Sequence, residues 1–292
     1  MKKKSVLYET DDCADFLDRE HRLSLRMLFS EYEITLLSCI LCRCDTRWSV
    51  PSRTRVYSFF AFPIYGNLHL STSEGEMIVK PGEFIMVAEN SMHALKIAKK
   101  FTHSEHFVLH CFIQDRWARP LLSRFPSPLG RLPDRTSWWA TLKELTCLMT
   151  HDPKIGKLRG ETLIRELLTW QLTQGPGLLS EAPEGDLRVS MVIDQMKRNF
   201  SSYDLSITEL AKLAKITTVQ LRTLFQRETG MGPKQFLQNL RMQKAVHFLD
   251  YTTMSVKEIA TACGFTSDHY FHPAFRKAFS STPSEYRKRV GR

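Results

Sequence analysis

The sequence lacks any run of about 18 apolar residues, the length that a membrane-spanning helix requires. It therefore predicts no membrane span. The first residues, MKKKSVLYETDDCADF, include lysines but no apolar stretch behind them, so we expect no secretory signal and a cytoplasmic location. A chain of 292 residues that is 42% hydrophobic and 25% charged is typical of a globular protein with two domains of ordinary size.

The sequence also lacks the residue spacings of a metal site. It contains no His-x-His pair, and no second Cys or His pair follows its one cysteine cluster at zinc-site spacing. That cluster lies in a predicted strand, where Cys42 and Cys44 share one face and Cys39 points to the other. We expect the seven cysteines of the chain to be free thiols, with a metal-binding or redox-sensing cluster as the alternative. No metal, no other cofactor and no catalytic residues are predicted.

Charge is distributed unevenly along the chain. Residues 188–292 contain 17 Lys and Arg against 8 Asp and Glu, a balance of +9. Residues 1–187 contain 24 against 23, a balance of +1. A near-neutral front and a basic rear are expected if only the rear meets a polyanion such as nucleic acid. A basic surface that serves solubility is the alternative that charge alone leaves open.

Two segments of different periodicity make up the front of the chain. Residues 48–113 alternate apolar and polar side chains between turns such as Gly66 and Pro81-Gly82, which predicts short strands in an antiparallel barrel or sandwich. Residues of about 134–175 have helical periodicity and predict two helices. The Gly- and Pro-rich residues 176–187 form the predicted linker, and only helices are expected after it. The predicted fold class is therefore α+β.

The rear segment contains an internal repeat of two helix-turn-helix units, over about 205–230 and 254–280. Each unit begins with a Ser and has a Glu three residues later, which is the pattern of a reciprocal capping box. The two boxes are Ser206–Glu209 and Ser255–Glu258. Between the units, the amphipathic stretch PKQFLQNLRMQKAVHFLDY predicts one linker helix that holds them apart. In each unit the second helix is the one placed to enter a DNA major groove.

Several stretches of the rear segment closely resemble the DNA-binding domain of the AraC/XylS family of bacterial transcription regulators. The resemblance runs from Leu205 to Arg287, and its most specific parts are LFQRETGMGP, IATACGF and TPSEYR. Through Trp48 and the stretches RVYSFFAFPIYG and VKPGEFIMVAENSMH, the front segment resembles the cupin-type sensing domain of that family. The resemblance implies a sensor domain over residues 1–175 and a DNA-binding domain over residues 188–292.

The resemblance also implies a function. It indicates a sequence-specific DNA-binding regulator, more often an activator than a repressor, and not an enzyme. The expected partners are promoter DNA, RNA polymerase, a small-molecule effector such as a sugar or other polar metabolite, and a second copy of the chain paired through helices 134–175. Three alternatives stay open: a cupin metalloenzyme fused to a DNA-binding tail, a regulator switched by a partner protein, and helices that simply pack against the barrel.

Carried over residue by residue, the resemblance implies DNA contacts from the solvent faces of two recognition helices. The base-contacting candidates are Thr218, Val219, Arg222 and Thr223 in the first helix, and Asp268, His269 and His272 in the second. Arg222 is expected to bond a guanine edge bidentately, with a phosphate contact as the alternative. The phosphate-contacting candidates are Arg241, Arg276 and Arg287. An internal structural pairing suits Arg241 equally well.

Three residues depart from the family pattern. Pro273 lies inside the second recognition helix, where it removes a backbone donor and predicts a kinked helix that reads bases poorly. We therefore expect the first unit to supply most of the sequence specificity. Lys215 occupies the turn position that Gly264 holds in the second unit, and a positive φ there would cost about 1 kcal/mol. Ser280 stands where relatives often have glycine, with a similar mild penalty.

A small effector is expected in the interior of the barrel. The candidates with polar reach are Arg55, Tyr57, Glu89 and His93. They occur among the aromatic residues Trp48, Phe59 and Phe84, a mixture that suits a sugar or related polar metabolite, although Arg55 suits an organic acid equally well. The sequence leaves the effector, the operator and the sign of regulation open.

Overall fold

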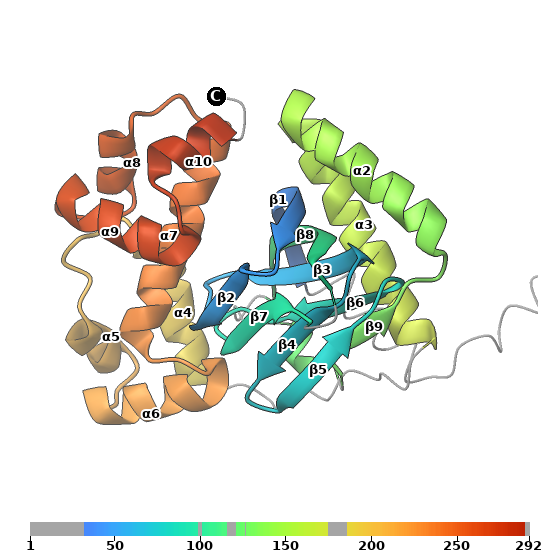
Figure 1. Ribbon diagram of the computed structural model, residues 1–292. Helices are drawn as coiled ribbons and strands as arrows, with labels where there is room; N and C mark the ends of the chain where they lie inside the picture. The colour runs from blue at the N-terminus through green and yellow to red at the C-terminus, as the bar shows by residue number, and fades with distance from the viewer. Residues whose placement is uncertain (1–31, 99–100, 116–120, 126, 175–185, 290–292) are drawn as a thin grey trace, which may run out of the picture.

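The computed structural model describes residues 32–98, 101–115, 121–125, 127–174 and 186–289 (Figure 1). An N-terminal β-sandwich is followed by two long helices and then by a domain made of helices only, which confirms the predicted α+β class. Of the predicted sandwich and barrel, the sandwich is the one that forms. Almost all of the predicted linker, 176–187, lies outside the described residues.

The sandwich consists of two antiparallel sheets. The first has the order β1 (Tyr32–Asp45), β8 (His103–Asp115), β3 (Ser58–Tyr65), β6 (Glu83–Val87) and β9 (Leu129–Arg131). The second has the order β2 (Ser49–Arg53), β7 (His93–Ile97), β4 (Leu68–Thr72) and β5 (Gly75–Val79). The first sheet contains the two longest strands, β1 and β8, which pair along almost their whole length.

Side-chain alternation gives the first sheet two different faces. On one face, residues such as Leu36, Phe60 and Leu109 form the main core together with the helices α2 (Arg135–His151) and α3 (Pro153–Gln174). On the opposite face, side chains such as Phe59 and Val108 pack against the second sheet. Because the cores lie on both faces, the strands of this sheet are apolar at consecutive positions.

The cysteine cluster lies in β1 as predicted. Cys39 belongs to the core beneath the helices, whereas Cys42 packs against the core between the two sheets, so the two thiols point to opposite faces. Burial raises the pKa of Cys39 and of Cys42 to about 11, which keeps both protonated and poor in nucleophilic character. Among the described residues, no group of three or more His, Cys, Asp or Glu side chains is placed to hold a metal ion.

Helices α2 and α3 pack their apolar faces on the first sheet, through residues such as Leu142, Leu145 and Leu168. One alternative that the sequence left open was that these helices simply pack against the strands of the front domain, and the structure has this packing. Ile155 and Leu158, near the start of α3, remain exposed, so the pairing of two chains through these helices stays a prediction. In the part of the chain that the structure describes, no helix is both long and apolar enough to span a membrane.

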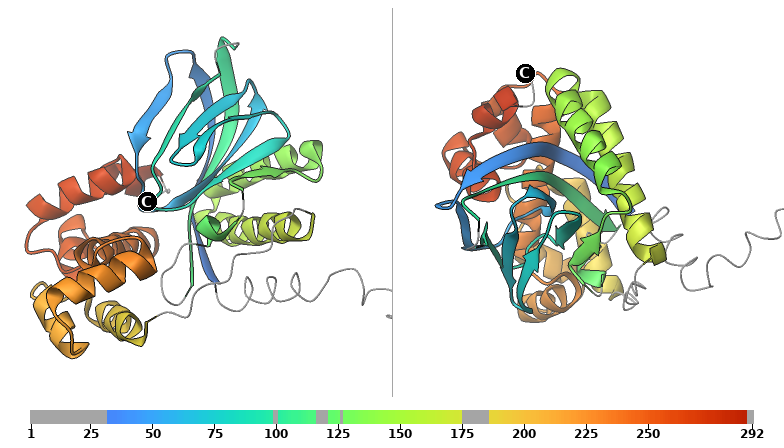
Figure 2. Two further views of the ribbon diagram at one scale, coloured as in Figure 1. Left: turned by 90° about the horizontal axis from the view of Figure 1, so that it is seen from below. Right: turned by 45° about the vertical axis from the view of Figure 1, so that its right-hand side comes forward.

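The C-terminal domain contains seven helices within the described range. They are α4 (Leu187–Asn199), α5 (Ile207–Leu213), α6 (Thr218–Thr229), α7 (Pro233–Tyr251), α8 (Val256–Ala262), α9 (Asp268–Phe279) and α10 (Pro283–Arg289). The helices α5 and α6 form the first helix-turn-helix unit, and α8 and α9 form the second. Figures 1 and 2 show this domain and the pair α2 and α3 flanking different sides of the sandwich.

Candidate nucleic-acid interface

The first helix-turn-helix unit starts both of its helices with reciprocal caps. The predicted box at α5 is present, because Glu209 N donates to Ser206 Oγ at 3.1 Å and the Glu209 carboxylate accepts from Ser206 N at 3.4 Å. A second box, which the sequence analysis missed, joins Thr217 and Gln220 at the start of α6. Its signal was a Thr followed three residues later by Gln. The recognition helix α6 is therefore fixed at its N-terminus by local sequence.

The helix α6 buries one face and presents the other to solvent. Leu221 and Phe225 are fully buried in the core of the first unit. Arg222 and Thr223 are exposed on the opposite side, and Val219 is 68% exposed. Four of the candidate base-contacting residues therefore lie on one helix, with Thr218 half-buried at its start. The long, charged Arg222 side chain extends from the middle of this face.

The second unit has the same plan with a weaker helix start. The predicted capping box at α8 forms between Ser255 and Glu258, with bonds of 2.6 and 3.2 Å. Ser267 occupies the N-cap of α9 but makes no side-chain cap bond. On α9, His269 is exposed, and the candidates Asp268 and His272 are half-buried.

Pro273 does not end the helix α9, which continues from Asp268 to Phe279. The proline cannot donate to the carbonyl of His269, four residues earlier. The buried residues Phe271 and Phe275 lie on either side of the proline and pack into the second core, and we infer that this packing offsets the lost bond.

The backbone adopts the left-handed conformation at Lys215 and Ser280, two of the three residues that depart from the family pattern. Lys215 has φ 55° and Ser280 has φ 57°, beside φ 75° at the equivalent Gly264. A Cβ at Gly264 would also lie 2.6 Å from the carbonyl oxygen of Phe200, so only glycine fits there. The turn at Lys215 therefore does require a positive φ, and the cost for a lysine there is about 1 kcal/mol.

The helix α7 separates the two units. Its 19 residues give a length of about 28 Å at 1.5 Å per residue. Successive major-groove segments on one face of B-DNA are about 34 Å apart, so a rod of this length suits two recognition helices that enter neighbouring segments.

The three arginine candidates for phosphate contact lie in different surroundings. Arg276 is exposed in the last turn of α9. The guanidinium of Arg241 donates to the carbonyl oxygens of Phe200 and Ser202, at 2.9 and 2.7 Å, which is the internal pairing that the sequence left open. Arg287 Nη2 donates to the Met254 carbonyl at 2.5 Å. Arg241 and Arg287 therefore brace the helical domain from within, and Arg276 is the one of the three that faces solvent.

The four effector candidates do not gather in one cavity. Arg55 Nη1 donates to Ser280 Oγ at 2.5 Å, and the Tyr57 ring stacks on Phe279 with centroids 5.9 Å apart, so both residues contact the end of α9. His93 is buried beside Phe59, with ring centroids 5.0 Å apart, and burial lowers its pKa. Glu89 lies elsewhere, on the wall of a cavity between the sandwich and the helical domain.

The second helix-turn-helix unit packs against the front domain. Its core includes Leu37, Tyr57 and Phe112 of the front domain beside its own helices. A second contact between the two domains is a buried ion pair of Lys157 in α3 with Asp250 in α7. The front domain is therefore in contact with both α7 and α9. Sequence spacing gave no signal for these contacts, since the residues that meet lie about a hundred or more positions apart.

Comparison with known proteins identifies the helical domain. A family described as "Helix-turn-helix domain" matches residues 210–289. The HTH-type transcriptional activator RhaR of Mannheimia succiniciproducens is 36% identical over 103 residues, covering 33% of this chain and 37% of that protein. The HTH-type transcriptional activator RhaS of Yersinia pestis is 30% identical over 161 residues, covering 51% of this chain and 56% of that protein. The matched segments thus span about half or less of these curated relatives.

One solved structure resembles the whole arrangement. ToxT from Vibrio cholerae O395, bound to (E)-4-(8-methylnaphthalen-1-yl)but-3-enoic acid, is 12% identical and superposes with a TM-score of 0.50, covering 89% of this chain and 100% of that chain. This likeness concerns the fold alone. The paired units, their caps and the spacing helix define a DNA-binding domain of the double helix-turn-helix class. This domain matches the helix-turn-helix family model and is similar in sequence to parts of the transcriptional activators RhaR and RhaS.

Proposed function

We propose that the protein is a sequence-specific DNA-binding transcription activator in which the front domain senses a small molecule. The observation that carries the proposal is the pair of recognition helices at the two ends of α7, in a segment with a net charge of +9 (17 Lys and Arg against 8 Asp and Glu). Such a segment neutralises phosphates without regard to sequence, whereas exposed side chains on the helices read bases.

The first unit is the main reader in this proposal. On α6, Arg222 has the length and the fork of donors that a guanine edge accepts, with Val219 and Thr223 beside it for thymine methyl and hydrogen-bonding contacts. On α9, Pro273 has no backbone donor, and His269 and Tyr270 are the exposed side chains of the first turn. The second unit then contributes phosphate contacts, with Arg276, and fixes the register on the duplex.

The test uses the full-length purified protein. Genomic fragments that it retains at low salt are sequenced to obtain its operator, and affinity is then measured for the operator and for a scrambled duplex at several salt concentrations. We expect preference for the operator and a steep loss of affinity with salt, because several phosphates are neutralised. Equal affinity for both duplexes would contradict the proposal.

Arg222 is tested by two variants. Arg222→Lys keeps the charge but loses the bidentate fork, so it should cost about 1–3 kcal/mol at one base pair and relax specificity there. Arg222→Ala should in addition reduce the salt dependence. Lys154→Ala is the control, because it removes an exposed charge from α3 in the front domain. Loss of affinity that is uniform across all sequences in Arg222→Lys would reassign this residue to phosphate contact.

A further inference from the structure

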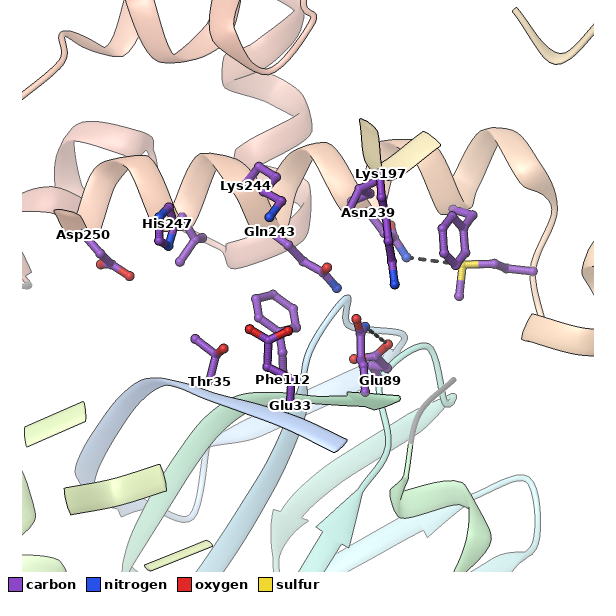
Figure 3. Close-up of a pocket in the computed structure, with 15 residues that line it drawn as sticks. Glu33, Thr35, Glu89, Phe112, Lys197, Asn239, Gln243, Lys244, His247 and Asp250 are labelled. Atoms are coloured by element: carbon purple, nitrogen blue, oxygen red, sulfur yellow. Dashed lines mark hydrogen bonds between the residues drawn. The ribbon is translucent and has the colours of Figure 1, made fainter. Parts of the chain in front are cut away.

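A cavity of about 260 Å³ lies between the two domains, with walls from both (Figure 3). One wall is the end of the first sheet, where β1 and β8 extend toward the helical domain. The other wall is formed by α7 and by the end of α4. A volume of this size holds a small metabolite, since a water molecule takes about 30 Å³ of liquid.

Glu89 gives this cavity an unusual polar feature. Its side chain is only 4% exposed, and Gln114 Nε2 donates to one of its carboxyl oxygens. The other oxygen, Oε2, is buried and has no hydrogen-bond partner among the described residues. A buried carboxyl oxygen without a donor is costly, so a ligand that brings a donor to it gains a strong bond.

The two walls differ in their ionisable groups. Glu33 and Glu89 lie on the sheet wall, and Lys197 and Lys244 lie on the helical wall, where Asp250 is already paired with Lys157 (Figure 3). Burial raises the pKa of Glu89 to about 8, and a cation bonded to this carboxyl group favours its ionised form. Between these groups the lining is apolar, with residues such as Phe112, Phe236 and Leu240. A ligand that is negative at both ends, or positive at both ends, meets repulsion on one wall.

We propose that this cavity binds a small zwitterion, an α-amino acid with an apolar side chain, with its ammonium group on Glu89 and its carboxylate toward Lys197 and Lys244. The side chain lies against the apolar lining. This inference rests on the proposed function, because it names the effector class of the same regulator. It differs from the sugar or organic acid that composition alone suggested, since neither brings opposite charges to the two walls.

Ligand binding at this place couples to DNA binding through α7. The lining residues Lys244 and His247 belong to the helix that sets the separation of the two recognition helices. A molecule that bonds Glu89 on one side and α7 on the other fixes the helical domain relative to the sandwich. Its binding free energy therefore differs between arrangements of the two domains, which is the requirement for an allosteric effect.

The test is calorimetric titration of the full-length protein, without DNA, with three molecules of matched shape. Leucine carries both charges, 3-methylbutylamine carries only the amine, and 4-methylpentanoate carries only the acid. Alanine, methionine and phenylalanine extend the series of side chains. We expect saturable binding of at least one amino acid, about tenfold or more tighter than its one-charge analogues. Binding of the acid alone as tightly as leucine, or of no amino acid at millimolar concentration, overturns the proposal.

Two variants test the site itself. Glu89→Gln keeps the size of the side chain but removes the carboxyl group that can ionise beside an ammonium group, and it should weaken amino-acid binding about tenfold or more. Glu74→Gln, in the exposed turn between β4 and β5, is the control and should bind like the unmodified protein. Circular dichroism and a melting curve verify that Glu89→Gln is folded. Unchanged amino-acid affinity in folded Glu89→Gln contradicts the assignment.

Operator binding is measured separately in the presence of each ligand. If the protein binds its operator but takes up no amino acid, the effector assignment fails and the proposed function stands. If the amino acid binds and no operator preference exists, the site stands and the proposed function fails. A change of at least severalfold in operator affinity on amino-acid binding, lost in Glu89→Gln, supports both.

Discussion

The two helix-turn-helix units share one plan but differ in what surrounds them. The first unit has a core drawn entirely from its own domain, with residues such as Val192, Leu221 and Phe225. The second unit shares its core with Leu37, Tyr57 and Phe112 of the front domain. Repeated local sequence thus gives the same local fold twice, whereas packing against a distant segment gives only one copy a contact with the sensor.

The two recognition helices also differ in how their ends are stabilised. The recognition helix α6 has a reciprocal cap at its start and Gly230 at its end. The recognition helix α9 has no side-chain cap bond, contains Pro273 and ends at Ser280, whose hydroxyl accepts from Arg55. The first unit is therefore stabilised by its own sequence. The second depends more on tertiary contacts, and we infer that it is the unit through which the front domain acts.

The largest expected effect comes from the matched core residues Phe225 and Phe275, both fully buried. Replacing either by Ala should cost about 3–5 kcal/mol of unfolding free energy. Phe225→Ala should loosen the first unit alone. Phe275→Ala should also loosen the contact with the sandwich, because Phe275 packs against Phe279, whose ring stacks on Tyr57.

Segment-resolved hydrogen exchange distinguishes the two variants. In Phe275→Ala, we expect faster exchange in β1 and β8 as well as in α8 and α9. In Phe225→Ala, the strands should keep the exchange rates of the unmodified protein. Equal changes of strand exchange in both variants would remove the proposed difference between the two units.

The buried ion pair between Lys157 and Asp250 should have the next largest effect. Its two side chains are 4% and 3% exposed. Removing one partner leaves an uncompensated buried charge, so Lys157→Met should cost about 3–5 kcal/mol. The double variant Lys157→Met with Asp250→Leu should recover much of this loss. Chemical denaturation measures the free energy of unfolding of the single and the double variant. If Lys157→Met is as stable as the double variant, the ion pair does not join the domains.

Pro273→Ala should act in the opposite direction. It restores a backbone donor to the carbonyl of His269 and removes the clash of the ring, so it should stabilise α9 by up to about 3 kcal/mol. Thr223→Ala is the control at the equivalent place in α6. Pro273→Arg should in addition tighten or alter the preference for the second half-site. Base-scanned operators measure this preference, and identical profiles for Pro273→Arg and the unmodified protein would show that the proline does not limit reading.

A change in the pH dependence of stability is expected at the cavity between the two domains. Burial raises the pKa of Glu89 to about 8, from an ordinary 4.5. The folded protein then holds a proton between those values that the unfolded chain releases, so stability falls as pH rises from about 4.5 to about 8. Glu89→Gln should flatten this slope in melting curves. A slope unchanged in the variant would mean that another group causes it.

Much of the DNA-binding domain could be predicted because its signals are local. A capping box spans four residues, and the boxes at Ser206 and Ser255 form where the sequence placed them. The positive φ at Lys215 followed from comparison with Gly264, because a tight turn imposes the same backbone on both copies. The alternation in the front segment predicted an antiparallel sheet fold for the same reason, since side-chain direction has a fixed period along a strand.

The roles of single side chains were harder to predict. From the sequence, Arg241 suited a phosphate contact and an internal bond equally well. The hydrogen bond from its Nε to the Phe200 carbonyl, which forms only in the folded chain, favours the internal bond. Arg55 and Tyr57 were expected in a ligand site, but they contact the end of α9, more than 200 residues away. No periodicity within a segment encodes which distant segment will cover it.

The sequence by itself determined the two recognition helices, the capping boxes at Ser206 and Ser255, the spacing helix and an antiparallel sheet fold, because backbone bonds and side-chain periodicity act over a few residues. Only the tertiary structure decided that the second unit shares a core with the sandwich, that Glu89 faces a cavity, and that α7 forms its opposite wall. Those features depend on the mutual fit of surfaces from distant parts of the chain. Their free energy arises when water is excluded between them, which no local pattern reports.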